Sequence, residues 1–183
     1  MRRVAITGLG VVSALGNSVP EFWDKLSRGL PGIAPIRLVD CSHMRFQNGA
    51  EVKNPAAHFD SSKLALLDRF AQFGLVSARE AIRDSGIQFD SETKKRTAIV
   101  TGSSVGGQTT QDEQFVEIYR NSRPRVHPFT IARTMANAGA SHISMEFGIT
   151  GPVFTISTAC SSSYHAIGNA FWMVRNGQAD IAI

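Results

Sequence analysis

One of the two cysteines in this 183-residue sequence lies between a strand-like run and a series of small hydroxyl residues, in VFTISTACSSS (153–163). Apolar residues at helical spacing follow it, namely Ala166, Ile167, Ala170, Met173 and Val174. The pattern predicts that Cys160 lies at or just before a helix N-terminus. Free backbone amides and the helix dipole stabilise a thiolate at such a place, and the amides can hold an oxyanion when sulfur attacks a carbonyl.

The small neighbours of Cys160, Ala159 and Ser161 to Ser163, would let a substrate approach the sulfur. We therefore interpret Cys160 as a candidate nucleophile. A buried cysteine that happens to end a strand is an equally good interpretation of these residues alone. The other cysteine, Cys41, lies in a polar irregular segment and is assigned no function.

A nucleophilic thiol needs basic or polarising partners, and the sequence offers no obvious one. His165 follows Cys160 by five residues, about 140° around a helix of 3.6 residues per turn, so we expect it to point away from the sulfur. The histidines have no partner at a metal-binding spacing, so we predict no metal site; they are His43, His58, His127, His142 and His165.

Two glycine-rich segments do not match nucleotide-binding loops. Gly8 and Gly10 fit the first two glycines of G-x-G-x-x-G, but Ser13 occupies the third position. The segment TGSSVGG (101–107) lacks the lysine of a phosphate-binding loop. We therefore expect nucleotide binding at neither segment, and a serine hydrolase is not the expected class of enzyme.

The composition is that of an ordinary globular protein, with 43% hydrophobic and 19% charged residues. No apolar run has membrane-spanning length, and two cysteines do not indicate a disulfide framework, so we expect a cytoplasmic protein. The net charge is +4, with basic clusters at 94–96 and 120–125. These clusters are either solvated surface or a docking face for an acidic partner. No aromatic-interleaved basic stripe indicates nucleic-acid binding.

Short buried strands are expected to alternate with helices. Strands are predicted at 2–8, 96–102, 153–158 and 179–183, and helices at 61–86, 109–121, 127–148 and after Cys160. A further helix is expected with Ser18 as N-cap and Gly29 at its exit, and Thr110 and Glu113 stand in capping-box register. This order predicts a layered α/β fold. The final apolar strand has nothing after it, so we expect the chain to be the first part of a longer protein.

Four ordered blocks resemble the β-ketoacyl-[acyl carrier protein] synthases, in the elongating branch of the type II enzymes. TACSSS (158–163), preceded by GP and followed by HAIGNA, is similar to their active-site segment. The start of the chain (2–33), VTGSSVGG (100–107), HPFTIARTMANAGASHI (127–143) and GQADIAI (177–183) are similar to other blocks in the same order. The resemblance covers essentially the whole chain.

The resemblance implies a thiolase-like fold of two similar α/β halves. Residues 1–183 would be the N-terminal half, cut within a strand, and the strand before Cys160 would lie near the two-fold contact of a homodimer. Cys160 would take an acyl group from a carrier thioester, and the carbanion from a decarboxylated malonyl-carrier thioester would attack that acyl group. The Cys160 N–H would be one of two oxyanion donors. Val105 and Thr130 match positions that line the acyl pocket, Thr130 reaching toward the partner subunit.

The family's two catalytic histidines and its lysine lie in the C-terminal half, so the 183-residue chain alone is expected to be inactive. Lys63, Arg69 and Arg125 correspond loosely to carrier-docking residues. No metal or organic cofactor is implied beyond the phosphopantetheine arm of the acyl carrier protein, and neither nucleic acid nor a membrane is an expected partner. The leading function is fatty acid elongation. One alternative is a polyketide or polyene ketosynthase subunit. A second is a non-catalytic partner in a heterodimer, although the presence of Cys160 argues against it. A third is an inert half-domain.

Overall fold

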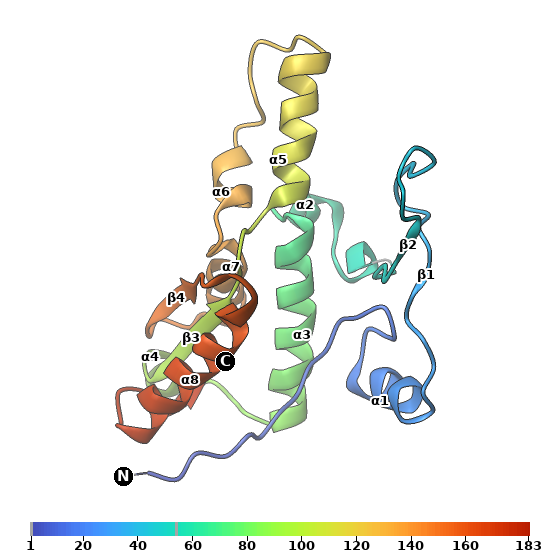
Figure 1. Cartoon of the computed structure of the whole chain (residues 1–183). Coiled ribbons are helices and arrows are strands. Elements are labelled where there is room, and N and C mark those ends of the chain that lie inside the picture. Colours follow the sequence, from blue (N-terminus) through green and yellow to red (C-terminus); the bar gives the residue numbers. More distant parts are fainter. Residues whose placement is uncertain (1, 54) are drawn as a thin grey trace.

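A parallel three-stranded sheet forms the centre of the computed structural model, which describes residues 2–53 and 55–183 (Figure 1). The strand order is β4 (Val153–Ile156), β3 (Thr97–Gly102) and β5 (Ile181–Ala182). Gly102 pairs with Ile156, so β3 and β4 end at the same level. The alternation of helices and strands therefore produces the predicted α/β architecture, because parallel neighbours need helical crossovers.

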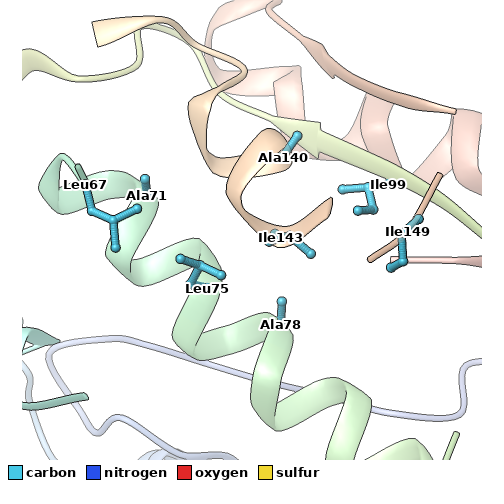
Figure 2. Packing of buried hydrophobic residues seen from close by; sticks show 8 residues of the cluster. All are labelled: Leu67, Ala71, Leu75, Ala78, Ile99, Ala140, Ile143 and Ile149. Atoms are coloured by element: carbon cyan, nitrogen blue, oxygen red, sulfur yellow. The ribbon is translucent and has the colours of Figure 1, made fainter. Parts of the chain in front are cut away.

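Helices cover both faces of the sheet. Successive side chains of β3 point to opposite faces. Ile99 joins a core with α3 (Arg69–Ser85) and α7 (Ala138–Phe147), whereas Ala98 and Val100 join a second core with α8 (Ser162–Arg175). Figure 2 shows the first core, in which the side chains of α3 face those of α7 and the strand. The segment around Cys160 thus lies between β4, at one edge of this sheet, and α8, which packs on one of its faces.

Several predicted helices form with the expected caps. The side chain of Ser18 accepts from the backbone of Glu21 at the start of α1 (Val19–Ser27). Gly86 ends α3 with a φ of +69°, a conformation that glycine adopts without strain. The helix predicted over 61–86 is nevertheless two helices, α2 (Ser61–Leu64) and α3, because Asp68 caps α3 and also accepts from the buried Thr110 N–H at 2.7 Å.

Two further helix predictions are wrong in detail. α5 (Gln108–Phe115) begins after Gly107, so Thr110 lies inside the helix rather than in a capping box. It continues as a π-helical segment, η2 (Val116–Arg120). The helix predicted over 127–148 is interrupted by the extended residue Met135, which separates α6 (Thr130–Thr134) from α7. Gly148 ends α7 as predicted.

The strand predicted over 2–8 does not form in the described part of the chain. In Figure 1 this segment runs from the end of α8, where the Arg2 N–H donates to the Arg175 carbonyl at 3.2 Å, to the C-terminal end of α3, and it pairs with no strand. Two amides just after it bond to carboxylates of α3 instead, Leu9 N–H to Asp84 at 2.9 Å and Val11 N–H to Glu80 at 3.0 Å. A β-rich sequence becomes a strand only where a sheet edge accepts it, and here the side chains of a helix satisfy these groups.

The remaining elements are short. β1 (Ala34–Pro35) and β2 (Asn48–Gly49) form an antiparallel pair, and the single turns are η1 (Pro55–His58), α4 (Ser91–Lys95) and η3 (Ala159–Ser161). Within the described residues, no helix is both long enough and apolar enough to cross a bilayer.

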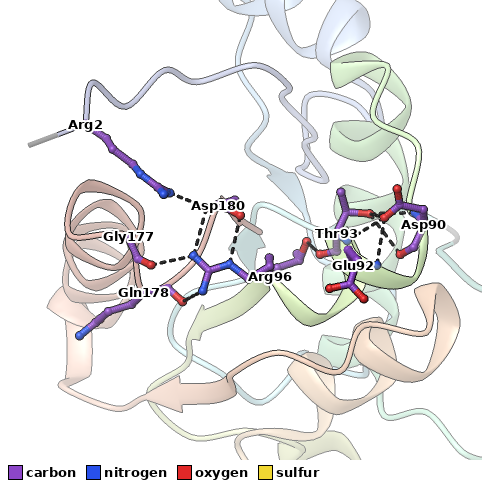
Figure 3. Close-up of polar contacts among 9 residues, drawn as sticks. Arg2, Asp90, Glu92, Thr93, Arg96, Gly177, Gln178 and Asp180 are labelled. Carbon is purple, nitrogen blue, oxygen red and sulfur yellow. Dashed lines mark hydrogen bonds and ion pairs between the residues drawn. The ribbon is translucent and has the colours of Figure 1, made fainter.

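Arg96 ties the start of β3 to the turn that leads into β5 (Figure 3). Its guanidinium donates to the carbonyls of Gly177 at 2.7 Å and Gln178 at 3.2 Å, and it pairs with Asp180 at 3.1 Å. Arg2 pairs with the same carboxylate. Hydrogen bonds from Arg96 and Arg2 hold the pKa of Asp180 well below its usual value. Arg96, one of the clustered basic residues, is therefore engaged in holding the fold.

Candidate active site

Cys160 lies in η3, between β4 and α8, and its side chain is exposed. The predicted succession of strand, turn and helix is confirmed, and the alternative of a buried cysteine is wrong. Cys41 is the buried one, with 8% of its surface exposed. The two thiols therefore differ in access: a solvent-borne reagent can reach Cys160 in the folded chain, while Cys41 is shielded.

The residue before the cysteine has a strained backbone. Ala159 has a φ of +51°, and Ser122 is the other non-glycine residue with a positive φ in the described chain. For an L-residue with a Cβ this left-handed conformation costs about 1–2 kcal/mol. Such strain persists only where surrounding contacts impose it, and it clusters at functional sites. Here it accompanies the sharp change from the extended segment after β4 to the helical turn at Cys160.

Hydroxyl groups impose this turn. Ser162, 3% exposed, accepts from the Thr158 N–H at 2.9 Å and donates to the Ala159 carbonyl at 2.7 Å. Ser161 donates to the Thr158 carbonyl at 2.7 Å. The side chains of 161 and 162 thus close the loop that Cys160 occupies. From the sequence these serines were expected only to leave space around Cys160, although a run of hydroxyl residues after a strand also signals side-chain bonds to the backbone.

The end of β3 packs closely against the turn that carries Cys160. A Cβ on Gly102 would lie 2.5 Å from both the carbonyl carbon and the oxygen of Ser162. This separation is well inside van der Waals contact, so glycine is required for the strand to approach the first turn of α8 so closely.

The Cys160 amide is open. No residue of the described chain accepts a hydrogen bond from the Cys160 N–H, as expected for the first turn of a helical segment. An exposed thiol and a free amide on the same residue can serve as nucleophile and oxyanion donor.

His165 is bound to the turn rather than to the sulfur. Its Nδ1 lies 2.8 Å from the hydroxyl of Thr158. No hydrogen bond within residues 2–53 and 55–183 joins its ring to Cys160, in line with the prediction that it points elsewhere. His165 therefore holds Thr158, two positions before Cys160, through this hydrogen bond.

Val105 and Thr130 occupy different surroundings. Val105 is exposed on the loop after β3, and the Ser157 hydroxyl donates to the neighbouring Ser104 carbonyl at 3.2 Å, which joins this loop to the segment before Cys160. Thr130 is the first residue of α6, and its hydroxyl donates to the His127 carbonyl at 2.6 Å. The structure thus brings the Val105 loop beside the cysteine segment, whereas no hydrogen bond of the described chain joins Thr130 to Cys160.

The basic residues named for carrier docking differ in availability. Lys63 pairs with Glu146, and Arg69 donates to the Val52 carbonyl at 2.7 Å. Arg125, in contrast, lines an open groove of about 690 Å³, together with Glu117 and His127. The first two residues are engaged within the fold, and the third faces a groove of mixed charge that does not include Cys160.

The whole sequence, residues 1–183, matches the family described as beta-ketoacyl synthase, N-terminal domain. The chain belongs to the beta-ketoacyl synthase family. It is 39% identical over 194 residues to a protein of Streptomyces cyaneus named as a polyketide beta-ketoacyl synthase 1, covering 100% of this chain and 45% of that protein. It is 35% identical over 184 residues to 3-oxoacyl-[acyl-carrier-protein] synthase 2 of Coxiella burnetii, covering 100% of this chain and 44% of the relative.

Solved structures of beta-ketoacyl synthases share the fold. The structure of the ishigamide ketosynthase/chain length factor superposes with a TM-score of 0.90 at 26% identity, over 99% of this chain and 46% of the other. The thiolase-like fold class and the match to its N-terminal half are thereby confirmed. The chain spans somewhat less than half the length of the relatives that it matches.

Proposed function

We propose that this beta-ketoacyl synthase chain supplies the nucleophile of a condensing acyltransferase. The observation that carries the proposal is the exposed Cys160 on a strained turn, with its own amide free. The Cys160 thiolate attacks the carbonyl of an acyl-carrier thioester, and the carbonyl oxygen becomes an oxyanion. The oxyanion then collapses and expels the carrier sulfur, which takes up the proton that the cysteine lost. The acyl group is then a thioester of Cys160.

The second half-reaction makes the carbon–carbon bond. A malonyl-carrier thioester loses carbon dioxide, and the electron pair of the broken bond attacks the acyl carbonyl on Cys160. The sulfur then leaves as a thiolate and regenerates the enzyme. In both half-reactions negative charge develops on one carbonyl oxygen, where the Cys160 N–H is the donor that this chain provides. Val105 and Thr130 are proposed to line the acyl pocket.

The substrate class is the acyl carrier protein with its acyl chain, and the leading pathway is fatty acid elongation in the cytoplasm by a homodimer. The Coxiella burnetii relative, named a 3-oxoacyl-[acyl-carrier-protein] synthase, supports this reading. The higher identity to a protein named for polyketide synthesis favours a second candidate, a polyketide ketosynthase subunit. A non-catalytic partner role is less well supported, because the nucleophile is present and exposed.

A labelling experiment tests the nucleophile. The full-length protein is incubated with the hexanoyl thioester of N-acetylcysteamine, and the acylated residue is found by mass spectrometry of peptides. We expect one acyl group, on Cys160; Cys160→Ala should abolish it, whereas Cys41→Ala should keep it. Acylation that persists in the Cys160 variant would exclude the assignment.

A product assay separates the two pathways. The full-length protein is given malonyl-carrier protein with or without hexanoyl-carrier protein. A fatty acid enzyme should extend the hexanoyl chain by one condensation. Repeated condensation to a poly-β-keto chain, in the presence of a second ketosynthase-like subunit, would support the polyketide candidate instead.

A further inference from the structure

The geometry points to Ser162 as a positioning residue, which fixes the peptide between Ala159 and Cys160 and so aims the Cys160 N–H at the oxygen of the reacting acyl group. This inference rests on the proposed function, and it concerns what orients one group of that site.

Ser162 is placed to act on this one peptide. Its hydroxyl donates to the Ala159 carbonyl at 2.7 Å, and its backbone N–H donates to the same oxygen. The hydroxyl is anchored in turn, because it accepts from the Thr158 N–H at 2.9 Å. With 3% of the residue exposed, water has little access to replace these bonds.

The planarity of the peptide carries the effect to Cys160. The Ala159 carbonyl and the Cys160 N–H belong to one trans peptide unit, so they point in opposite directions. Since Ser162 draws the carbonyl toward the first turn of α8, the N–H must point outward from that turn. In the described chain Cys160 thus combines an exposed side chain with an amide that is left unpaired.

The bond from Ser162 resists rotation of this peptide. Rotation about the Ala159 Cα–C bond would leave the φ of +51° unchanged, but it would turn the Cys160 N–H away from the oxyanion. The hydroxyl of Ser162 opposes this rotation, because it would break the bond to the Ala159 carbonyl.

Two reactions of the same sulfur separate this role from a general effect. Acyl transfer from hexanoyl-N-acetylcysteamine passes through an oxyanion, whereas alkylation by iodoacetamide displaces iodide and forms none. In the full-length protein we expect Ser162→Ala to slow acylation of Cys160 by at least tenfold, since complete loss of an oxyanion donor costs about 100-fold or more. Alkylation of Cys160 should fall much less than acylation, because alkylation needs the thiolate but forms no oxyanion for the amide to stabilise. Ser144→Ala is the control, since Ser144 also donates to a carbonyl, that of Ile149, at 2.8 Å.

The alternatives are distinguishable. Equal loss of both reactions in Ser162→Ala, or loss of neither, would overturn the inference. Failure of the unsubstituted protein to acylate, while iodoacetamide still modifies Cys160, would overturn the proposed function and the inference with it. Alkylation of the buried Cys41 reports unfolding. If Cys41 is alkylated in Ser162→Ala, that variant is replaced by Ser162→Cys. Cysteine keeps a side chain of similar shape, but its thiol donates only weakly to the Ala159 carbonyl. The same selective loss of acylation is then expected, and its absence would refute the role.

Discussion

Replacing Gly102 by alanine tests how closely β3 supports the turn that carries Cys160. The added Cβ would lie 2.5 Å from the carbonyl carbon and the oxygen of Ser162 and 2.6 Å from the Ser163 nitrogen. Atoms in favourable contact are about 3.5 Å apart or more, so the first turn of α8 must move by about 1 Å. Overpacking of this kind costs about 1–3 kcal/mol of unfolding free energy.

The same displacement should affect acyl transfer more than stability. Moving reacting groups by about 1 Å can cost on the order of 100-fold in rate, and the displaced residues adjoin Cys160 in sequence. We therefore expect Gly102→Ala to lower the urea midpoint of unfolding, followed by circular dichroism. Acylation of Cys160 by the hexanoyl thioester should fall by more than about tenfold.

Gly168→Ala provides the matched control, because a Cβ on Gly168, also in α8, meets no atom within 4 Å. Alanine is better than glycine inside a helix by about 1 kcal/mol, so this variant should be more stable than the unsubstituted protein. An unchanged midpoint and an unchanged acylation rate in Gly102→Ala would refute the reasoning, since both effects follow from the same contact.

Three further predictions concern stability, measured by urea unfolding. Thr110 and Thr97 are fully buried, but only Thr97 has a partner for its hydroxyl, the Thr93 carbonyl at 2.6 Å. Thr110→Val should stabilise and Thr97→Val destabilise, each by about 1 kcal/mol; the same sign for both would contradict the argument. Burial lowers the pKa of His142 from 6.5, so the unfolded chain binds its proton more readily and stability should fall as the pH drops below about 6.5. His142→Gln should flatten this part of the profile, and an unaltered slope would count against it. Hydrogen bonding to Arg79 lowers the pKa of Glu146 from 4.5, so the stability that it contributes above that pH should be lost as the pH falls through the lowered value. Glu146→Gln should reduce this acid sensitivity, and a profile like that of the parent would exclude the role.

The surroundings of Cys160 were predictable because their signals are local. A β-branched run, small hydroxyl residues and helical spacing all lie within 26 residues, 152–177, and each indicates its element without knowledge of the rest of the chain. The glycines that end α3 and α7 were also predictable, since the left-handed conformation at a helix end selects glycine whatever the helix packs against.

Other predictions depended on contacts between distant residues, which the sequence pattern does not contain. The segment at 2–8 contains the β-rich run VAIT, but the amides that follow it bond to Glu80 and Asp84 of α3. The helix predicted over 61–86 is interrupted because Asp68 binds an amide of α5, 42 residues away.

The sequence by itself determined the order of the elements and the residue most suited to nucleophilic chemistry, because hydrophobic periodicity and residue type act over short range. Only the tertiary structure decided that Cys160 is the exposed thiol and Cys41 the buried one. It also decided that Ala159 is strained and that Gly102 meets the start of α8. These properties arise from the close packing of backbone segments that are separated along the chain, and packing at that distance is set by the whole fold.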